Sequence, residues 1–197
     1  MNKLDIVLIG PMGVGKSTIG KLLASHLKLP QKSMDEFRWD YYKEIGYDKT
    51  YARELDQTEG GLSVYRYWKQ FEIHAVERLL EEHNNCVIDF GAGHSVYEDD
   101  AYLQRAKAAL KPFQYVILLL PSPDKTLCLK RLNGDESDED AELNRHFIEH
   151  KSNYELATHI IYTEGAKPDE TLAEVLKLFS INVLSVFNLL FLSAILL

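Results

Sequence analysis

A lysine and a serine follow a glycine-rich segment near the start of the chain. The segment reads Gly10-Pro-Met-Gly-Val-Gly-Lys16-Ser17, which fits the spacing G-x-x-x-x-G-K-[ST]. Glycines let a backbone fold tightly enough for consecutive N–H groups to point at phosphate oxygens, a lysine neutralises the outer phosphates, and a hydroxyl coordinates Mg²⁺. This chemistry predicts a loop that binds ATP together with Mg²⁺. The residues expected to contact the nucleotide are Gly10, Gly13, Val14, Gly15, Lys16, Ser17 and Thr18.

The sequence on either side of this loop has the pattern that such a site requires. Residues 6–9 are Ile-Val-Leu-Ile, a short apolar run typical of a strand buried on both faces of a sheet. From Lys16 onward apolar residues recur at helical spacing, and Pro30 ends the pattern. A helix that begins at the loop directs the positive end of its dipole at the bound phosphates. This context favours a phosphate-binding loop over a glycine-rich turn that matches by chance.

Further apolar runs predict the elements that position the loop. Strands are expected at residues 86–90, 115–120 and 159–162, with a short extra strand at 32–34. Helices are expected at about 62–83, 98–110, 123–132, 142–156 and 168–179. Alternating strands and helices predict a parallel sheet that is covered on both faces. We therefore expect an α/β fold of the P-loop NTPase type, with about five parallel strands, over residues 1–179.

Two aspartates are expected at the same edge of this sheet as the loop. Asp89 ends the strand at 86–90, and Asp35 follows the short strand at 32–34. Ligands of open α/β sheets bind at the carboxyl ends of the strands. Both could therefore face the same crevice as Ser17, and Asp89 stands where a carboxylate would hold the metal or its waters. The alternative for each is a helix cap or an exposed side chain.

Composition narrows the class of protein. A formal net charge of −8 argues against binding nucleic acid through its phosphates. Cys86 and Cys128 lie far apart in apolar runs, which favours two buried thiols in a reducing compartment. Residues 1–10 show no signal-peptide pattern, so we expect a cytoplasmic protein. The acidic stretch at 134–140 is expected to be a solvated loop and is compatible with a lid at about 133–145.

With these residues in hand, the chain resembles the shikimate kinase family, within the nucleoside-monophosphate-kinase-like group. The resemblance is closest over residues 6–24 and continues weakly to about 179. It implies that Asp35 is the second aspartate of the family's Asp-x-Asp motif, which contacts substrate hydroxyls. It also implies that Lys69 stands where the family's Phe-Arg-x-x-Glu motif grips the substrate carboxylate, with Arg66 one turn away.

The same resemblance implies the remaining roles. The family's triple glycine appears as Gly91-Ala-Gly93, followed by His94, which implies substrate contacts there. Arg131 corresponds to an arginine that contacts adenine. The family's lid contains a catalytic arginine, whereas residues 133–140 contain none, and Arg145 is the nearest substitute. Aromatic residues such as Tyr65 and Trp68 could form a pocket wall or belong to the core.

These features together predict Mg-ATP-dependent phosphoryl transfer to a hydroxyl of a small anionic metabolite. Lys16 and Ser17 would hold triphosphate and metal, Asp89 would assist the metal, and Arg145 would close on the transferring group. Two alternatives remain open. One is a kinase whose acceptor is a nucleotide, nucleoside or sugar acid. The other is a nucleotide-binding regulatory or membrane-associated ATPase.

The end of the chain differs from the rest. Fifteen of the twenty residues at 178–197 are apolar, and none is charged. Such a segment is long enough to span a bilayer, although two asparagines make that costly. We treat residues 180–197 as a hydrophobic tail. Packing within the protein or an oligomer is favoured over membrane attachment, and a non-native extension is the third alternative.

Overall fold

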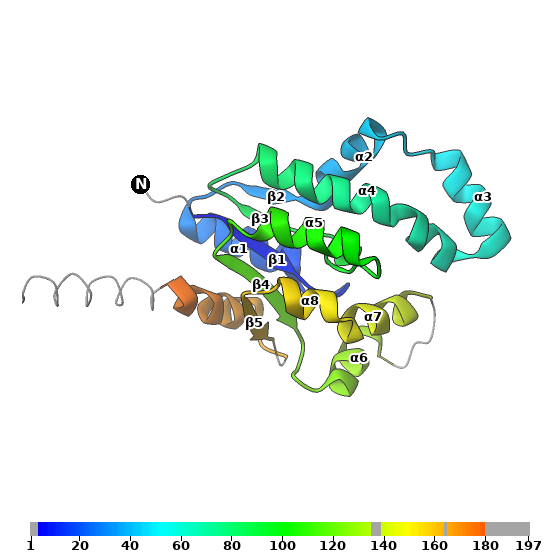
Figure 1. Ribbon diagram of the computed structural model, residues 1–197. Helices are drawn as coiled ribbons and strands as arrows, with labels where there is room; N and C mark the ends of the chain where they lie inside the picture. Colours follow the sequence, from blue (N-terminus) through cyan, green and yellow to red (C-terminus); the bar gives the residue numbers. More distant parts are fainter. Residues whose placement is uncertain (1–3, 135–138, 164, 180–197) are drawn as a thin grey trace, which may run out of the picture.

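A five-stranded parallel sheet lies at the centre of the computed structural model, which describes residues 4–134, 139–163 and 165–179 (Figure 1). The strand order is β2-β3-β1-β4-β5, and every neighbouring pair is parallel. The strands are β1 (Ile6–Ile9), β2 (Gln31–Ser33), β3 (Val87–Asp89), β4 (Tyr115–Leu120) and β5 (His159–Tyr162). The predicted α/β fold of the P-loop NTPase type is confirmed.

Alternating side chains of the strands pack into two separate cores. On one face, Val7 and Ile88 pack with residues of α4 (Gly61–Glu82) and α5 (Asp100–Leu110). On the other face, Ile6 and Leu8 pack with residues of α1 (Lys16–Leu27) and of a helix at 168–179. All residues of β1 and β4 are buried because helices cover both faces. The two edge strands, β2 and β5, are partly exposed.

Two helices project beyond the sheet in a region where no helix was predicted. They are α2 (Met34–Glu44) and α3 (Lys49–Glu59), which lie beside α4 (Figure 1). Helix α3 buries only Ala52, so its sequence lacks the wide apolar stripe by which helices are recognised. Its start is fixed by Asp48, whose side chain accepts from the N–H groups of Thr50 and Tyr51. The expected strand at 32–34 is shifted by one residue, because Met34 begins α2.

The expected helix at 142–156 is wrong, because the structure contains two helices there. They are α7 (Glu139–Glu149) and α8 (Lys151–Leu156), and His150 between them is extended with ψ 137°. The ring of His150 accepts from the N–H of Ser152 at 3.2 Å and so caps α8. Asn153 then donates to the Phe147 carbonyl at 2.8 Å, across the break. Histidine is an uncommon helix cap, so the break is not evident from the sequence. Apolar periodicity alone therefore predicted a single helix.

Some predicted segments lie wholly or partly outside the described residues. Helix α6 (Lys125–Asn133) precedes the expected lid, of which residues 135–138 are not described. The hydrophobic tail at 180–197 is not described either, so the domain boundary at 179 stays a prediction. Among the helices that the structure does describe, none has the length and apolar character needed to cross a membrane.

Gly10 provides a test of how tightly the loop fits against the sheet. Its φ is 140°, and a Cβ there would overlap the carbonyl oxygen of Leu119 in β4. Gly46 has a φ of 84° but open space around it, so it is a matched control. Alanine costs about 1–2 kcal/mol in the left-handed region, and the overlap adds about 1–3 kcal/mol. Urea unfolding should show a larger loss of stability for Gly10→Ala than for Gly46→Ala. Equal losses would contradict this packing.

Candidate active site

The glycine-rich loop joins β1 to α1, as its sequence predicts. Three of its glycines, Gly10, Gly13 and Gly15, have positive φ angles of 140°, 75° and 96°. Lys16 lies at the start of α1, and its Nζ donates to the carbonyls of Gly10 and Pro11, each at 2.8 Å. Burial lowers the pKa of Lys16 to about 8, against the opposing effect of Asp89 and Asp35. The lysine is thus folded onto its own loop, with an ammonium that anionic oxygens would stabilise.

The other predicted nucleotide residues occupy this loop or the first turn of α1, with the exception of Arg131. Val14 is buried in the core under the sheet, whereas the side chains of Ser17 and Thr18 are exposed at the helix start. Arg131 lies at the exposed end of α6, where a Cβ added at Gly165 would meet its Nη1 at 3.4 Å. Val14 therefore supports the loop from below, while Ser17 and Thr18 lie exposed in the first turn of α1.

Asp89 and Ser17, the two predicted metal ligands, are in direct contact. The Ser17 hydroxyl donates to Asp89 Oδ1 at 2.8 Å, and Asp89 is only 2% exposed. Ser33 donates to the same oxygen at 2.9 Å, and Gln31 donates to Oδ2 at 2.6 Å. Both belong to β2, where Ser33 stands opposite Asp89 in the parallel register. The sequence analysis did not single out either donor, although a polar end of β2 beside that of β3 could have indicated them.

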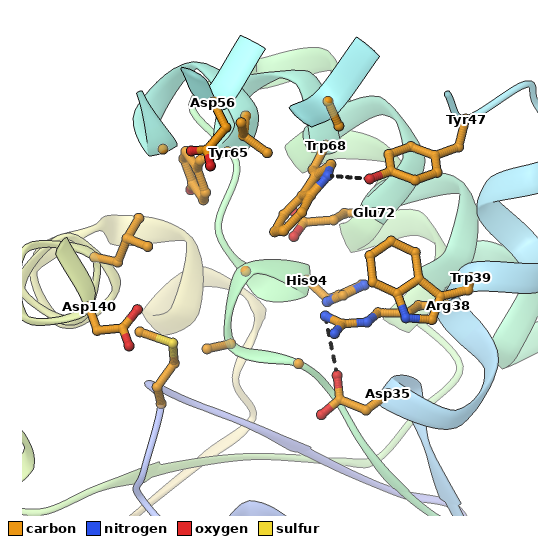
Figure 2. A pocket seen from close by; sticks show the side chains of 18 of the residues that line it. Asp35, Arg38, Trp39, Tyr47, Asp56, Tyr65, Trp68, Glu72, His94 and Asp140 are labelled. Carbon is orange, nitrogen blue, oxygen red and sulfur yellow. Dashed lines mark hydrogen bonds and ion pairs between the residues drawn. The ribbon is translucent and has the colours of Figure 1, made fainter. Parts of the chain in front are cut away.

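A cavity of about 590 Å³ opens next to the loop at the carboxyl ends of β2 and β3 (Figure 2). This volume is typical of a small-molecule site. Met12 of the loop borders it on one side, and side chains from α2, α3, α4 and α7 surround the rest. Four predicted substrate residues line it: Asp35, Gly91, Gly93 and His94. Among the described residues, no group of three or more histidine, cysteine or acidic side chains could hold a metal ion.

Lys69 does not face this cavity. Its ammonium, within a side chain that is 6% exposed, forms an ion pair with Glu72 and donates to the carbonyls of Gly93 and Val96 at 3.0 and 3.1 Å. Glu72 is equally enclosed, and a Cβ at Gly93 would come within 2.5 Å of its Oε1. Lys69 therefore joins α4 to the 3-10 turn η1 (Ala92–Ser95). The role that its sequence position suggested, gripping the acceptor, does not fit this geometry.

Two predicted arginines also lie away from the cavity. Arg66 is exposed and borders a separate hollow with Glu98 and His146. Arg145 is exposed on α7 and borders a hollow between α6 and α7, together with Lys125 and Lys130. Helix α7 instead approaches the loop through Asn144, whose side-chain oxygen accepts from the Met12 N–H at 2.8 Å. Asn144 was not anticipated, because an asparagine inside a helix has no spacing signal.

Arg38 is a further residue that the sequence analysis missed. It lines the cavity from α2, one turn after Asp35, and its Nη1 lies 3.4 Å from Asp35 Oδ1. Figure 2 shows its guanidinium directed into the cavity between Asp35 and His94. The spacing of three residues on one helix could have placed it beside Asp35, had α2 been expected.

His94 is held neutral at the floor of the cavity. It is 1% exposed, and its Nε2 lies 3.1 Å from the hydroxyl of Tyr42. Burial, together with the positive charges of Lys69 and Arg38, lowers its pKa to about 3. A Cβ at Gly91 would approach its Nδ1 to 2.8 Å. His94 can therefore shape the floor and form hydrogen bonds there, but it supplies no positive charge near neutral pH.

Comparisons with known proteins agree with the resemblance found in the sequence. The model of the shikimate kinase family matches residues 12–180. A shikimate kinase of Francisella tularensis subsp. holarctica is 36% identical over 89 residues, which are 45% of this chain and 45% of the relative. The chain thus matches less than half the length of this curated relative.

Solved structures show the same fold. A shikimate kinase from Acinetobacter baumannii, in complex with shikimate, has a TM-score of 0.59 at 20% identity, covering 91% of this chain and 94% of its own. Another from Aquifex aeolicus has a TM-score of 0.56 at 24% identity, covering 92% and 99%. The family match confirms the predicted membership of the group, whereas these structures support the fold alone.

The burial of Lys69 predicts a large effect of its partner on stability. Glu72→Gln leaves an uncompensated ammonium in the interior, which should lower the free energy of unfolding by about 3–5 kcal/mol. The double variant Lys69→Met, Glu72→Gln should be more stable than the single variant, because it removes both charges. Urea unfolding of the three proteins measures this. The control is Asp40→Asn, which breaks an exposed ion pair with Lys43 and should change little. A loss for Glu72→Gln no larger than the control's would contradict a buried pair.

Proposed function

The chain belongs to the shikimate kinase family, and we propose that it transfers the γ-phosphoryl group of Mg-ATP to a hydroxyl of a small anionic metabolite. The observation that supports this most directly is the contact of Ser17 with Asp89 at the carboxyl end of β3, close in the chain to Gly91 of the cavity of about 590 Å³ that Asp35 also lines. Groups for holding a nucleotide and for contacting an acceptor therefore meet at one edge of the sheet. In phosphoryl transfer, such positioning and charge neutralisation provide most of the catalysis.

The residues present fit Mg²⁺. A serine hydroxyl and a carboxylate, 2.8 Å apart, offer the oxygen ligands that this ion prefers, with room left for phosphate and water on the exposed side of Ser17. Mg²⁺, when bound, neutralises charge on the β- and γ-phosphates. Ser17 and Asp89 would hold it, and Gln31 and Ser33 would keep the Asp89 carboxylate in place through their hydrogen bonds.

The remaining steps fall to side chains of this chain. Lys16 would exchange the carbonyls of Gly10 and Pro11 for phosphate oxygens, regaining the charge that burial disfavours. Asp35 would orient the acceptor hydroxyl and accept its proton as the hydroxyl oxygen attacks phosphorus. Gly91 and Gly93 let the acceptor approach the backbone closely at the cavity floor. Together these groups account for a kinase with a small acceptor.

One observation favours a second candidate, a nucleotide-binding protein with little kinase activity. The lid arginine implied by the family pattern has Arg145 as its nearest substitute, and Arg145 borders a hollow other than the acceptor cavity. A kinase lacking that charge would stabilise the transferring phosphoryl group less well. Slow ATP hydrolysis that no acceptor stimulates would support this candidate over the first.

The function is tested by acceptor-dependent release of ADP and by Lys16→Ala. The variant should abolish acceptor-dependent release and weaken ATP binding, while Lys21→Ala, an exposed lysine on the same helix, should change neither. Titration calorimetry near pH 8 should show proton uptake when ATP binds the unchanged protein, because anionic oxygens raise the lowered pKa of Lys16. Above pH 8 ATP binding should weaken as the free lysine loses its proton. A folded Lys16→Ala protein with unchanged ATP affinity would refute the proposal.

Substitutions of the two aspartates should impair activity in different ways. Asp89→Asn should raise the Mg²⁺ concentration needed for half-maximal rate, because the metal loses a charged ligand. Asp35→Asn should lower kcat by about 10²–10⁴ and leave ATP binding unchanged, because it removes a proton acceptor. Glu36→Gln, at the neighbouring exposed position, is the control for Asp35. Steady-state kinetics at several Mg²⁺ concentrations would distinguish the two, and normal turnover in both variants would show the assignment to be wrong.

A further inference from the structure

Among the residues that the structure describes, the cavity has one interior cation that is available to a ligand. Lys69 is engaged by Glu72 and two carbonyls, and it is not among the residues that line the cavity. Lys49 and Arg53 lie on the exposed surface of α3, at the cavity's outer side. Arg38 has a side chain that is only 29% exposed, and its guanidinium points inward (Figure 2). An anionic acceptor that enters this cavity therefore meets Arg38 before any other enclosed positive charge.

The hydrogen-bonding capacity of Arg38 is largely unused. Its contact with Asp35 joins a single nitrogen to a single oxygen at 3.4 Å. Its Nε is shielded from solvent and has no hydrogen-bond partner among the described residues. The nearby groups His94 and Tyr42 are uncharged at neutral pH and do not pair with it as ions. A guanidinium has five N–H donors in a planar fork, so most of these donors remain free for a ligand.

Aromatic rings hold this guanidinium and the wall beside it. Arg38 lies 4.7 Å from the ring centroid of Trp39, an arrangement that stabilises a planar cation. Trp39 meets Trp68 edge to face at 6.2 Å between centroids, and Trp68 donates to the Tyr47 hydroxyl at 3.3 Å. The wall is thus fixed by its own contacts, and it offers an apolar surface to the ring of an acceptor. A planar cation held in place loses little entropy when it binds a planar anion.

We propose that Arg38 is the specificity-determining residue for the acceptor: its guanidinium binds the acceptor's carboxylate, in place of the cation that the family pattern puts at Lys69. The inference rests on the proposed function in so far as the ligand is the phosphoryl acceptor. A planar fork matches a carboxylate through two parallel hydrogen bonds, which an ammonium does not do. Because Arg38 Nη1 lies 3.4 Å from Asp35 Oδ1, the reacting hydroxyl at Asp35 and the carboxylate at Arg38 must lie close together on the acceptor. Compact hydroxy acids are the class that satisfies this spacing.

Intrinsic fluorescence measures this binding without turnover. The chain has two tryptophans, and both, Trp39 and Trp68, line the cavity. The probes are shikimate and its uncharged methyl ester, titrated into the full chain with ADP present. The unchanged protein should bind the acid more tightly than the ester by roughly 10- to 100-fold. This ratio corresponds to the binding free energy that hydrogen bonds to a charged group contribute. In Arg38→Met, which keeps the apolar stem over Trp39, this preference should disappear.

Two further variants separate charge from shape. Arg38→Lys keeps a positive charge beside Asp35 but lacks the fork, so it should retain only part of the preference for the acid. Lys43→Ala, at an exposed position on the same helix, should bind both probes as the unchanged protein does. If Arg38→Met lost affinity for acid and ester equally, Arg38 would only shape the cavity and the proposal would be overturned. Absence of any acid preference in the unchanged protein, or of binding by either probe, would overturn it too.

The same titrations distinguish this inference from the proposed function. An Arg38-dependent preference for the acid, followed by no ADP release when ATP replaces ADP, would support acid binding at Arg38 and refute the kinase. ADP release stimulated by an acceptor, with kinetics unaffected by Arg38→Met, would support the kinase and refute Arg38 as its specificity residue. Where both hold, Arg38→Met should raise KM for the acid by the factor seen in binding and leave KM for ATP unchanged.

Discussion

A buried carboxylate that accepts hydrogen bonds from three donors holds together the edge of the sheet at which the candidate site lies. Asp89 ends β3 and accepts from Ser17 at the start of α1 and from Gln31 and Ser33 of β2. An ionised side chain that is 2% exposed needs such partners, since an unpaired buried charge costs several kcal/mol. The space around it is narrow, because a Cβ at Gly20 would lie 2.8 Å from the Gln31 amide. The phosphate loop and β2 are thereby fixed relative to each other.

The position of the acceptor cavity follows from that constraint. Ser33 is the last residue of β2, and α2 begins at the next residue, so the first turn of α2 cannot move independently of Asp89. Asp35 and Arg38 lie in the first two turns of this helix and face the cavity. The hydrogen bonds around Asp89, where we propose that Mg²⁺ binds, therefore also hold the first turn of α2 beside the cavity. The chain itself gives a second connection, because Gly91, Gly93 and His94 of the cavity closely follow Asp89.

The sequence allowed the central sheet and its phosphate loop to be predicted because their signals are local. Residues 6–9 are apolar and are followed at once by the loop, and the strands at 87–89 and 115–120 lie in similar apolar runs. The acceptor side could not be predicted in the same way. Whether Lys69 faces a ligand or a carboxylate depends on Glu72 and on two carbonyls of η1, which meet only in the folded chain. Arg38 was missed because no helix was predicted at α2, although Met34, Phe37, Tyr41 and Tyr42 recur there at helical spacing.

Lys69 and Arg38 together show how a lysine in place of an arginine at one position can alter the distribution of charge in such a cavity. A lysine at position 69 lacks the planar fork of an arginine, which could bind Glu72 and a ligand at once. Its single ammonium is instead paired inside the protein. A cation elsewhere is then required if the acceptor is anionic. Arg38 satisfies this requirement from α2, a helix that is held against α4 by aromatic contacts and lies outside the sheet. Because those contacts are separate from the hydrogen bonds around Asp89, the acceptor side can change its charge pattern while the nucleotide side keeps its geometry.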